Sequence, residues 1–132
     1  MNILLVEDDL LLAKGTAKLI ERMSGYQIQV RTDPAKIVEL CQSGTIDLVL
    51  MDVNLPGAKW EDRDMSGADI SCLLKKHPQT QHIPIILLTA YAMVTERERL
   101  LQVSGADEFY TKPITDYAAL IESIAQLCPK TS

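Results

Sequence analysis

The sequence predicts an α/β fold: a doubly wound, five-stranded parallel sheet with five helices on its two faces. Short apolar runs that each stop at a polar residue indicate strands buried on both sides. Longer segments with the apolar spacing of helices alternate with these runs, which is typical of right-handed crossovers between parallel strands. The 132 residues, 47% of them hydrophobic, suffice for one domain with a continuous core and no stabilising disulfide or metal.

The first half of the chain carries three of the strands. The first apolar run stops at the acidic residues 7–9 and the third stops at Asp52, as expected for strands that end at a polar crevice. The second run alternates polar and apolar residues, which favours a position nearer a sheet edge. Asp33-Pro34 then supplies an N-cap and a proline at the first helical position. The expected strands are residues 2–6, 26–32 and 46–51, and the expected helices are residues 10–23 and 34–43.

The second half begins with a long loop, residues 53–66. Within it, residues 58–64 are largely charged and contain Trp60, the only tryptophan. Thr115 is the expected N-cap of the last helix. The remaining expected elements are helices at residues 67–77, 92–103 and 115–127 and strands at residues 83–89 and 107–111.

The expected topology is flavodoxin-like, and it places the carboxyl ends of all strands at one edge of the sheet. Open parallel sheets bind ligands at that edge, where the strand order reverses. The residues that follow the strands there are Glu7, Asp8, Asp52, Thr89 and Lys112. Three carboxylates, one hydroxyl and one ammonium group are therefore expected to converge.

This cluster predicts a cation and phosphoryl chemistry. Carboxylates that lie together repel one another, which raises their pKa values unless a cation compensates. Mg²⁺ suits such a cluster because it binds through one or two carboxylates together with waters and phosphate oxygens. A carboxylate also acts as a nucleophile toward phosphorus when charge on the transferring oxygens is neutralised. We therefore expect Mg²⁺ at Glu7, Asp8 and Asp52, with Lys112 sharing the neutralising role.

Composition argues against several other classes of function. The net charge of -5 and the lack of Lys/Arg clusters argue against direct nucleic-acid binding. The amino terminus has neither the basic region of a signal peptide nor the length of a membrane span, so we expect a cytoplasmic protein that enters no membrane. The three cysteines lack the spacing of a zinc or redox motif and are expected to be free thiols: Cys41, Cys72 and Cys128.

Five segments carry a resemblance to a known family: ILLVEDD, LVLMDVNLPG, MSG, IPIILLTA and GADEFYTKP. Each alone is weak evidence, because a strand that ends in aspartate or a Lys-Pro turn occurs in many folds. Together, in this order and spacing, they resemble the receiver domains of response regulators over nearly the whole chain. The resemblance implies a single receiver domain, residues 1–132, of the chemotaxis type in two-component signalling.

The resemblance implies a role for each residue at the strand ends. Asp52 is implied to be the phosphoacceptor, while Thr89 and Lys112 are implied to bind phosphoryl oxygens. Ala90 is implied to stay small so that the phosphoryl group fits, and the Lys112–Pro113 bond is implied to be cis. The implied Mg²⁺ ligands are Glu7, Asp8, Asp52 and the backbone carbonyl of Asn54.

The resemblance also implies a conformational switch and tuning positions. In the family a threonine and an aromatic residue move together, which here are Thr89 and Phe109. Phe109 stands where tyrosine is commoner, and it lacks the hydroxyl. The implied readout surface comprises the fourth helix, the fifth strand and the fifth helix. Asn54 and Tyr91 occupy positions that tune the phosphoryl lifetime, and the bulk of Tyr91 predicts slow self-dephosphorylation.

The implied function is that of a phosphoacceptor response regulator, a switch rather than a turnover enzyme. A sensor histidine kinase or histidine phosphotransfer protein would donate to Asp52, and a downstream protein target would read the switch. We expect a monomer or a weak homodimer. Two alternatives stay open: a receiver-like interaction module that works without phosphorylation, and a small aspartyl-phosphate phosphatase of the haloacid-dehalogenase type. That phosphatase type has a second acidic residue two positions after its nucleophile, where this chain has Asn54.

The departure from the family lies in residues 58–64, which lengthen the loop after Pro56. One interpretation is a surface insertion, which loops tolerate because a doubling of length costs only about 0.6 kcal/mol. The other is that Trp60 lies beside Asp52, where it covers the site or contacts a partner kinase. Asp9 is expected to stabilise the amino terminus of the first helix rather than to bind metal.

Overall fold

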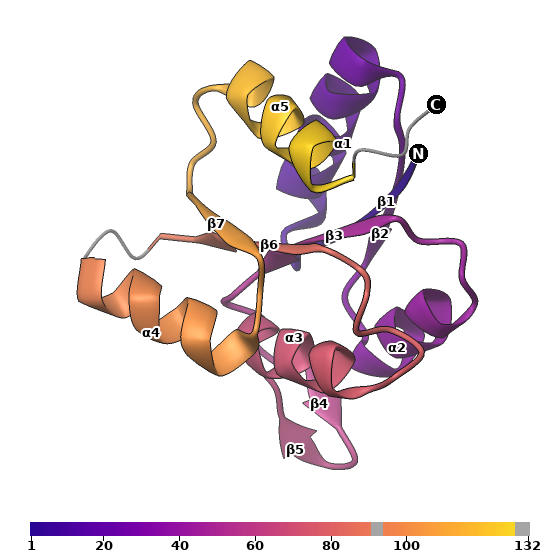
Figure 1. The fold of residues 1–132 in the computed structure, drawn as a ribbon, viewed down its shortest axis with the longest axis vertical. Coiled ribbons are helices and arrows are strands. Elements are labelled where there is room, and N and C mark those ends of the chain that lie inside the picture. Colours follow the sequence, from indigo (N-terminus) through magenta and orange to yellow (C-terminus); the bar gives the residue numbers. More distant parts are fainter. Residues whose placement is uncertain (91–93, 129–132) are drawn as a thin grey trace.

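The computed structural model, which describes residues 1–90 and 94–128, contains a five-stranded parallel sheet between two layers of helices (Figure 1). The elements are β1 (Asn2–Val6), α1 (Leu10–Ser24), β2 (Gln27–Arg31), α2 (Pro34–Gln42), β3 (Leu48–Asp52), β4 (Lys59–Trp60), β5 (Arg63–Asp64), α3 (Gly67–Lys76), β6 (Ile85–Thr89), α4 (Val94–Ser104), β7 (Glu108–Thr111) and α5 (Tyr117–Leu127). The strand order is β2-β1-β3-β6-β7, and β4 pairs with β5 outside this sheet. The predicted flavodoxin-like fold with five parallel strands and five helices is confirmed. The expected start of the fourth helix at residue 92 lies outside the described residues.

The central strands are buried on both faces, as their apolar runs predict. In β1, Ile3 and Leu5 pack with α1 and α5, whereas Leu4 and Val6 pack with α2 and α3. Every residue of β3 and β6 is buried, while β2 and β7 form the partly buried edges. Each buried Leu or Ile side chain contributes roughly 1.5–3 kcal/mol to stability. These two apolar layers therefore hold the strand ends, and the residues that follow them, in fixed positions.

Aspartates cap the first and last helices. The Oδ1 atom of Asp9 accepts a hydrogen bond of 3.1 Å from the backbone N–H of Leu12. This confirms that the Asp9 side chain stabilises the amino terminus of α1. The predicted N-cap of the last helix, Thr115, is wrong. Asp116 caps α5 instead, and its Oδ1 accepts from the amide of Ala119 at 3.0 Å. Aspartate is the better N-cap of the two adjacent candidates, so the helix begins one residue later than threonine would place it.

The long loop after β3 contains a short β-hairpin that the sequence pattern did not indicate. β4 and β5 pair antiparallel with Trp60 opposite Arg63, and the turn residues Glu61 and Asp62 have φ angles of 50° and 66°. Such two-residue turns usually contain glycine or asparagine, which tolerate positive φ angles. Glu61-Asp62 therefore carried no turn signal, and the expectation of a loop throughout residues 53–66 is wrong in this part.

The three cysteines are free, as expected, and their surroundings predict the order in which they react. Cys41 is buried in α2, and burial raises the pKa of its thiol to about 12. Cys128 is half-buried, and burial followed by the charges of Asp47 and Asp107 raises the pKa of its thiol. Because the thiolate is the reactive form and Cys41 is also buried, a disulfide reagent is expected to modify the two partly exposed cysteines, Cys72 and Cys128, first and Cys41 only after unfolding. Mass mapping of quenched time points measures the order, and early labelling of Cys41 would contradict it.

α1 exposes an apolar surface next to the strand ends. Leu10, Leu11 and Leu12 are 62%, 82% and 44% exposed, and Leu19 and Met23 are exposed further along the helix. Single exposed leucines are common, but three in one helical turn leave this end of α1 with apolar side chains on several sides, which suits a contact surface. Across the part of the chain that the structure describes, no helix combines the length and apolar character needed to cross a membrane.

Candidate functional site

Three carboxylates meet at the carboxyl ends of β1 and β3, as predicted. The two strands pair with Val6 opposite Met51, which sets Glu7 beside Asp52. Carboxylate oxygens of Glu7, Asp8 and Asp52 all lie within 4.8 Å of one another. Glu7 and Asp52 are only 4% and 3% exposed, whereas Asp8 is exposed. The cluster is thus buried on the side of the sheet and open to solvent at Asp8.

Lys112 supplies the cation of this cluster. It follows β7, which runs beside β6, and its amide donates to the carbonyl oxygen of Thr89 at 2.8 Å. The Nζ atom of Lys112 donates to Glu7 Oε1 at 2.8 Å and to Asp52 Oδ2 at 3.1 Å. The Lys112–Pro113 peptide bond is cis, which confirms that expectation. Lys112 therefore links the carboxyl ends of three strands.

The charges in the cluster do not balance, because one ammonium group faces three carboxylates. Burial lowers the pKa of Lys112, but its hydrogen bonds to Glu7 and Asp52 and their charges raise that pKa above its ordinary value overall. Partial burial, followed by the interaction with Glu7, raises the pKa of Asp8. An excess of negative charge on oxygen ligands fits a hard divalent cation, and Mg²⁺ matches this donor set.

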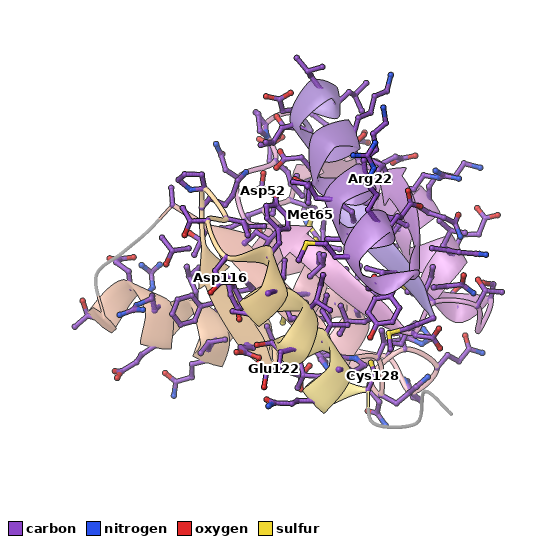
Figure 2. The ribbon with its side chains drawn as sticks, turned by 90° about the horizontal axis from the view of Figure 1, so that it is seen from above. Arg22, Asp52, Met65, Asp116, Glu122 and Cys128 are labelled. Atoms are coloured by element: carbon purple, nitrogen blue, oxygen red, sulfur yellow. The ribbon has the colours of Figure 1, made fainter. Side chains whose placement is uncertain are left out.

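A cleft of about 510 Å³ opens over these groups and gathers the predicted residues. Thr89, the last residue of β6, is 2% exposed and lines the cleft together with Ala90, which follows it. Asn54 lines the cleft as well, and its backbone N–H donates a hydrogen bond to Asp52 Oδ1 at 3.3 Å. In Figure 2, Asp52 and Cys128 mark opposite ends of the sheet. The residues that line the cleft are Glu7, Asp8, Asp9, Leu12, Asp52, Val53, Asn54, Thr89, Ala90 and Lys112.

Gly67 supports the site in a way that sequence reasoning missed. It begins α3, and its amide donates to the carbonyl oxygen of Val53 at 2.8 Å. A Cβ atom at this position would lie 1.9 Å from the carbonyl oxygen of Asp52 and 2.9 Å from Val53 Cα. Only glycine lets α3 approach the backbone that carries Asp52 so closely. The glycine of the MSG segment is the sequence signal for this close approach, but a glycine at the start of a helix does not by itself reveal it.

Two of the predicted residues that the structure describes do not line this cleft. Phe109 lies in β7, partly buried, three residues before Lys112. Trp60 lies in a groove beside α2 and α3 and packs on the core, so the expectation that it lies beside Asp52 is wrong. The β4–β5 hairpin explains this, since it directs the indole toward the two helices. Contact of Trp60 with a partner stays a prediction, and Tyr91 lies outside the described residues.

Comparisons with known proteins agree with this geometry. The model of the response regulator receiver domain family matches residues 3–125. The polar-differentiation response regulator DivK of Brucella anthropi is 33% identical over 114 residues, which cover 86% of this chain and 85% of DivK.

Two solved structures are similar to this one along nearly its whole length. The receiver domain of a signal transduction histidine kinase from Syntrophus aciditrophicus is 30% identical, with a TM-score of 0.79 and coverage of 99% of this chain and 92% of that one. The receiver domain of the sensor histidine kinase PA1611 of Pseudomonas aeruginosa is 26% identical, with a TM-score of 0.78 and coverage of 98% of both chains. That structure has a magnesium ion coordinated in its active-site cleft. The family match and the similarity to DivK confirm the resemblance seen in the five sequence segments, and this chain belongs to the response regulator receiver domain family.

Proposed function

We propose that residues 1–132 act as a single receiver domain that accepts a phosphoryl group on Asp52. The donor is a phosphohistidine of a sensor histidine kinase or of a histidine phosphotransfer protein, and a downstream protein reads the phosphorylated state. One observation carries this proposal: the Nζ atom of Lys112 pairs with both Glu7 and Asp52 in a cleft that Asp8 also lines. Such a site brings together a carboxylate that can act as a nucleophile, an ammonium group, and further carboxylate oxygens that can bind a metal ion.

In the proposed transfer, a carboxylate oxygen of Asp52 attacks phosphorus, and the bond from phosphorus to the donor imidazole nitrogen breaks. The electron pair of that bond leaves with the imidazole, and the product on this chain is an acyl phosphate. Lys112 balances charge on the phosphoryl oxygens, and the Thr89 hydroxyl is suited to donate a hydrogen bond to one of them. The methyl side chain of Ala90 leaves room for the group.

Mg²⁺ is the cofactor that we propose for this site, with Glu7, Asp8, Asp52 and the Asn54 backbone carbonyl as its ligands. When bound, it neutralises negative charge on the phosphoryl oxygens. Lys112 alone offsets the repulsion between an incoming phosphoryl anion and three carboxylates only in part. Phosphorylation is therefore expected to require the metal.

Intact-mass spectrometry tests the proposal without any partner protein. Wild-type protein incubated with acetyl phosphate and Mg²⁺ is expected to gain one phosphoryl group, and EDTA is expected to prevent the gain. No adduct in rapidly quenched samples would instead favour an interaction module that works without phosphorylation. Continuous release of phosphate from small phosphate monoesters would favour the phosphatase.

A protein donor also needs a docking surface beside the cleft, and the exposed leucines of α1 provide one. Leu12 lines the cleft that holds Asp52. A second groove of about 380 Å³ continues from Leu12 and Lys112 to Ile114 and Tyr117. Its lining is mainly apolar, which suits the apolar face of a helix on the donor protein.

Leu11→Glu is expected to slow transfer from a phosphohistidine protein by about tenfold or more, the effect of one lost interface anchor. Phosphorylation by acetyl phosphate is expected to stay unchanged, because Leu11 is 82% exposed and does not line the cleft. Val103→Glu is the matched control, since Val103 is an apolar residue of α4 that is 52% exposed. The measurement is the rate of adduct formation with each donor. Equal slowing with both donors would contradict the docking surface.

A further inference from the structure

β7, the strand that leads to Lys112, lies at the edge of the sheet (Figure 1). It has four residues, is only partly buried and, among the described strands, pairs only with β6. Register is specified most strongly where one face of a strand is fully buried, which is not the case in β7. A slip of one residue would move the strand by about 3.3 Å and turn every side chain to the other face. The position of Lys112 therefore depends on whatever fixes the register of β7.

Asp107, the residue before β7, fixes the pairing at the amino end of this strand. Its backbone N–H donates to the carbonyl oxygen of Ile85 at 2.9 Å, and its Oδ2 atom accepts from the backbone N–H of Ile85 at 2.8 Å. At the other end of β7, the backbone N–H of Lys112 donates to the carbonyl oxygen of Thr89 at 2.8 Å. Only the four residues of β7 separate Asp107 from Lys112, so the register set at Asp107 also decides what Lys112 meets.

Lys75, near the end of α3, holds the Asp107 carboxylate in place. Its Nζ atom donates to Asp107 Oδ2 at 2.9 Å, to the carbonyl oxygen of Ile83 at 2.8 Å and to that of Gln81 at 3.3 Å. The Lys75 side chain is only 17% exposed. An ammonium group has three N–H donors, and here three oxygens surround it, one of them charged. Lys75 thus joins the segment before β6 to the residue before β7.

α3 also holds the turn that precedes Asp107. One helical turn before Lys75, the buried Ser71 hydroxyl donates to the carbonyl oxygen of Ser104 at 3.0 Å. Gly105 has a φ angle of 68°, and a Cβ atom added there would lie 3.4 Å from Cβ and Cγ of Lys75. The chain before β7 therefore passes close to the aliphatic stem of Lys75 before it reaches the ammonium group. Two successive turns of one face of α3 set where β7 begins.

α3 thus contacts the backbone on both sides of the ion pair in the site. Its first residue, Gly67, packs against the backbone of Asp52, and Lys75 in its last turn holds Asp107. We propose that Lys75 is a positioning residue: through Asp107 it fixes the register of β7 and thereby places Lys112 beside Asp52. Lys75 does not line the cleft itself. The placement of Lys112 does not depend on the proposed function, whereas its effect on the rate of phosphorylation rests on that function.

Amide hydrogen exchange, followed by NMR in unphosphorylated protein, tests the placement. Lys75→Met removes the ammonium group and keeps an unbranched apolar stem. The backbone N–H groups of Asp107 and Lys112 are both expected to exchange about tenfold faster, the effect of one lost hydrogen bond between charged groups. The backbone N–H of Val53 bonds the carbonyl oxygen of Leu88, on the other side of β6, at 3.0 Å and is expected to keep its rate. Faster exchange at Asp107 with no change at Lys112 would overturn the proposal, as would equal acceleration of all three.

Two variants serve as rescue and control, and a third guards against a failure to fold. Lys75→Arg keeps a cation for Asp107 and is expected to restore slow exchange at Lys112. Lys76→Met changes the neighbouring, exposed lysine of the same helix and is expected to match wild type. If Lys75→Met does not fold, Asp107→Asn tests the same link, because it removes the charge that Lys75 holds. Wild-type exchange at Lys112 in Asp107→Asn would then overturn the proposal.

Intact-mass kinetics with acetyl phosphate and Mg²⁺ test the consequence for the site. Lys75→Met is expected to gain its phosphoryl group roughly tenfold more slowly than wild type, because misplacement of a group that neutralises charge raises the barrier. Lys76→Met is expected to match wild type. Equal rates for Lys75→Met and wild type would overturn this consequence. A lack of adduct on every protein, wild type included, would overturn the proposed function, while the exchange rates decide the placement of Lys112 independently.

Discussion

Asp52→Asn is expected to abolish the phosphoryl adduct that wild-type protein gains from acetyl phosphate and Mg²⁺. The amide keeps the shape of the carboxylate but lacks a nucleophilic anion, and it removes one of the proposed metal ligands. The fold is expected to survive, because Lys112 keeps its 2.8 Å hydrogen bond to Glu7. Intact-mass spectrometry of both proteins under the same conditions measures the loss.

Asp116→Asn is the matched control for this change. It removes the same charge from another aspartate, and asparagine is an equally good N-cap for α5. This variant is expected to gain the adduct at the wild-type rate. An adduct that persists on Asp52→Asn would move the phosphoacceptor to another side chain, which peptide mapping would then identify.

Gly67→Ala is expected to lower the free energy of unfolding by roughly 3 kcal/mol or more. The new Cβ atom would lie 1.9 Å from the carbonyl oxygen and 2.7 Å from the carbonyl carbon of Asp52. These are backbone atoms, so no side-chain rotation relieves the clash, and α3 must move away from β3. Urea denaturation monitored by circular dichroism measures the change.

Gly15→Ala provides the opposite expectation. Gly15 lies inside α1, and a Cβ atom there would meet no other atom within 4 Å. Alanine in a helix interior is favoured over glycine by about 0.5–1 kcal/mol, so this variant is expected to be more stable than wild type. A comparable loss of stability in both variants would show that the close approach at Gly67 is not the cause.

The sheet and the carboxylate cluster were predictable from sequence for a geometric reason. Apolar runs identify the buried parallel strands, and parallel strands share the edge at which they end. Glu7, Asp52, Thr89 and Lys112 each stand at or directly after the end of an expected parallel strand, so their convergence needed no knowledge of side-chain contacts. The edge position of β2 followed in the same way from its alternating pattern.

The features that could not be predicted depend on contacts between distant segments, which no local sequence pattern indicates. The turn at Glu61-Asp62 adopts positive φ angles without the glycine or asparagine that usually mark such turns, so the β4–β5 hairpin could not be predicted. Because of this hairpin, Trp60 lies beside α2 and α3 and not beside Asp52. The ion pair of Lys75 with Asp107 joins a helix and the start of a strand that are only brought together by the fold.

Lys112 forms ion pairs with two residues that are distant in sequence: Glu7 lies 105 residues before it and Asp52 lies 60 residues before it. During synthesis the two carboxylates therefore leave the ribosome well before the ammonium group that pairs with them. Contacts between segments so far apart form late in folding, because the intervening chain must first be ordered. A nascent or partly unfolded chain thus lacks the cation of its own site, and we expect competence for phosphorylation to arise only once β7 has joined the sheet. Under the proposed function, the late formation of these two ion pairs would then keep incomplete copies of the protein from competing for phosphoryl donors.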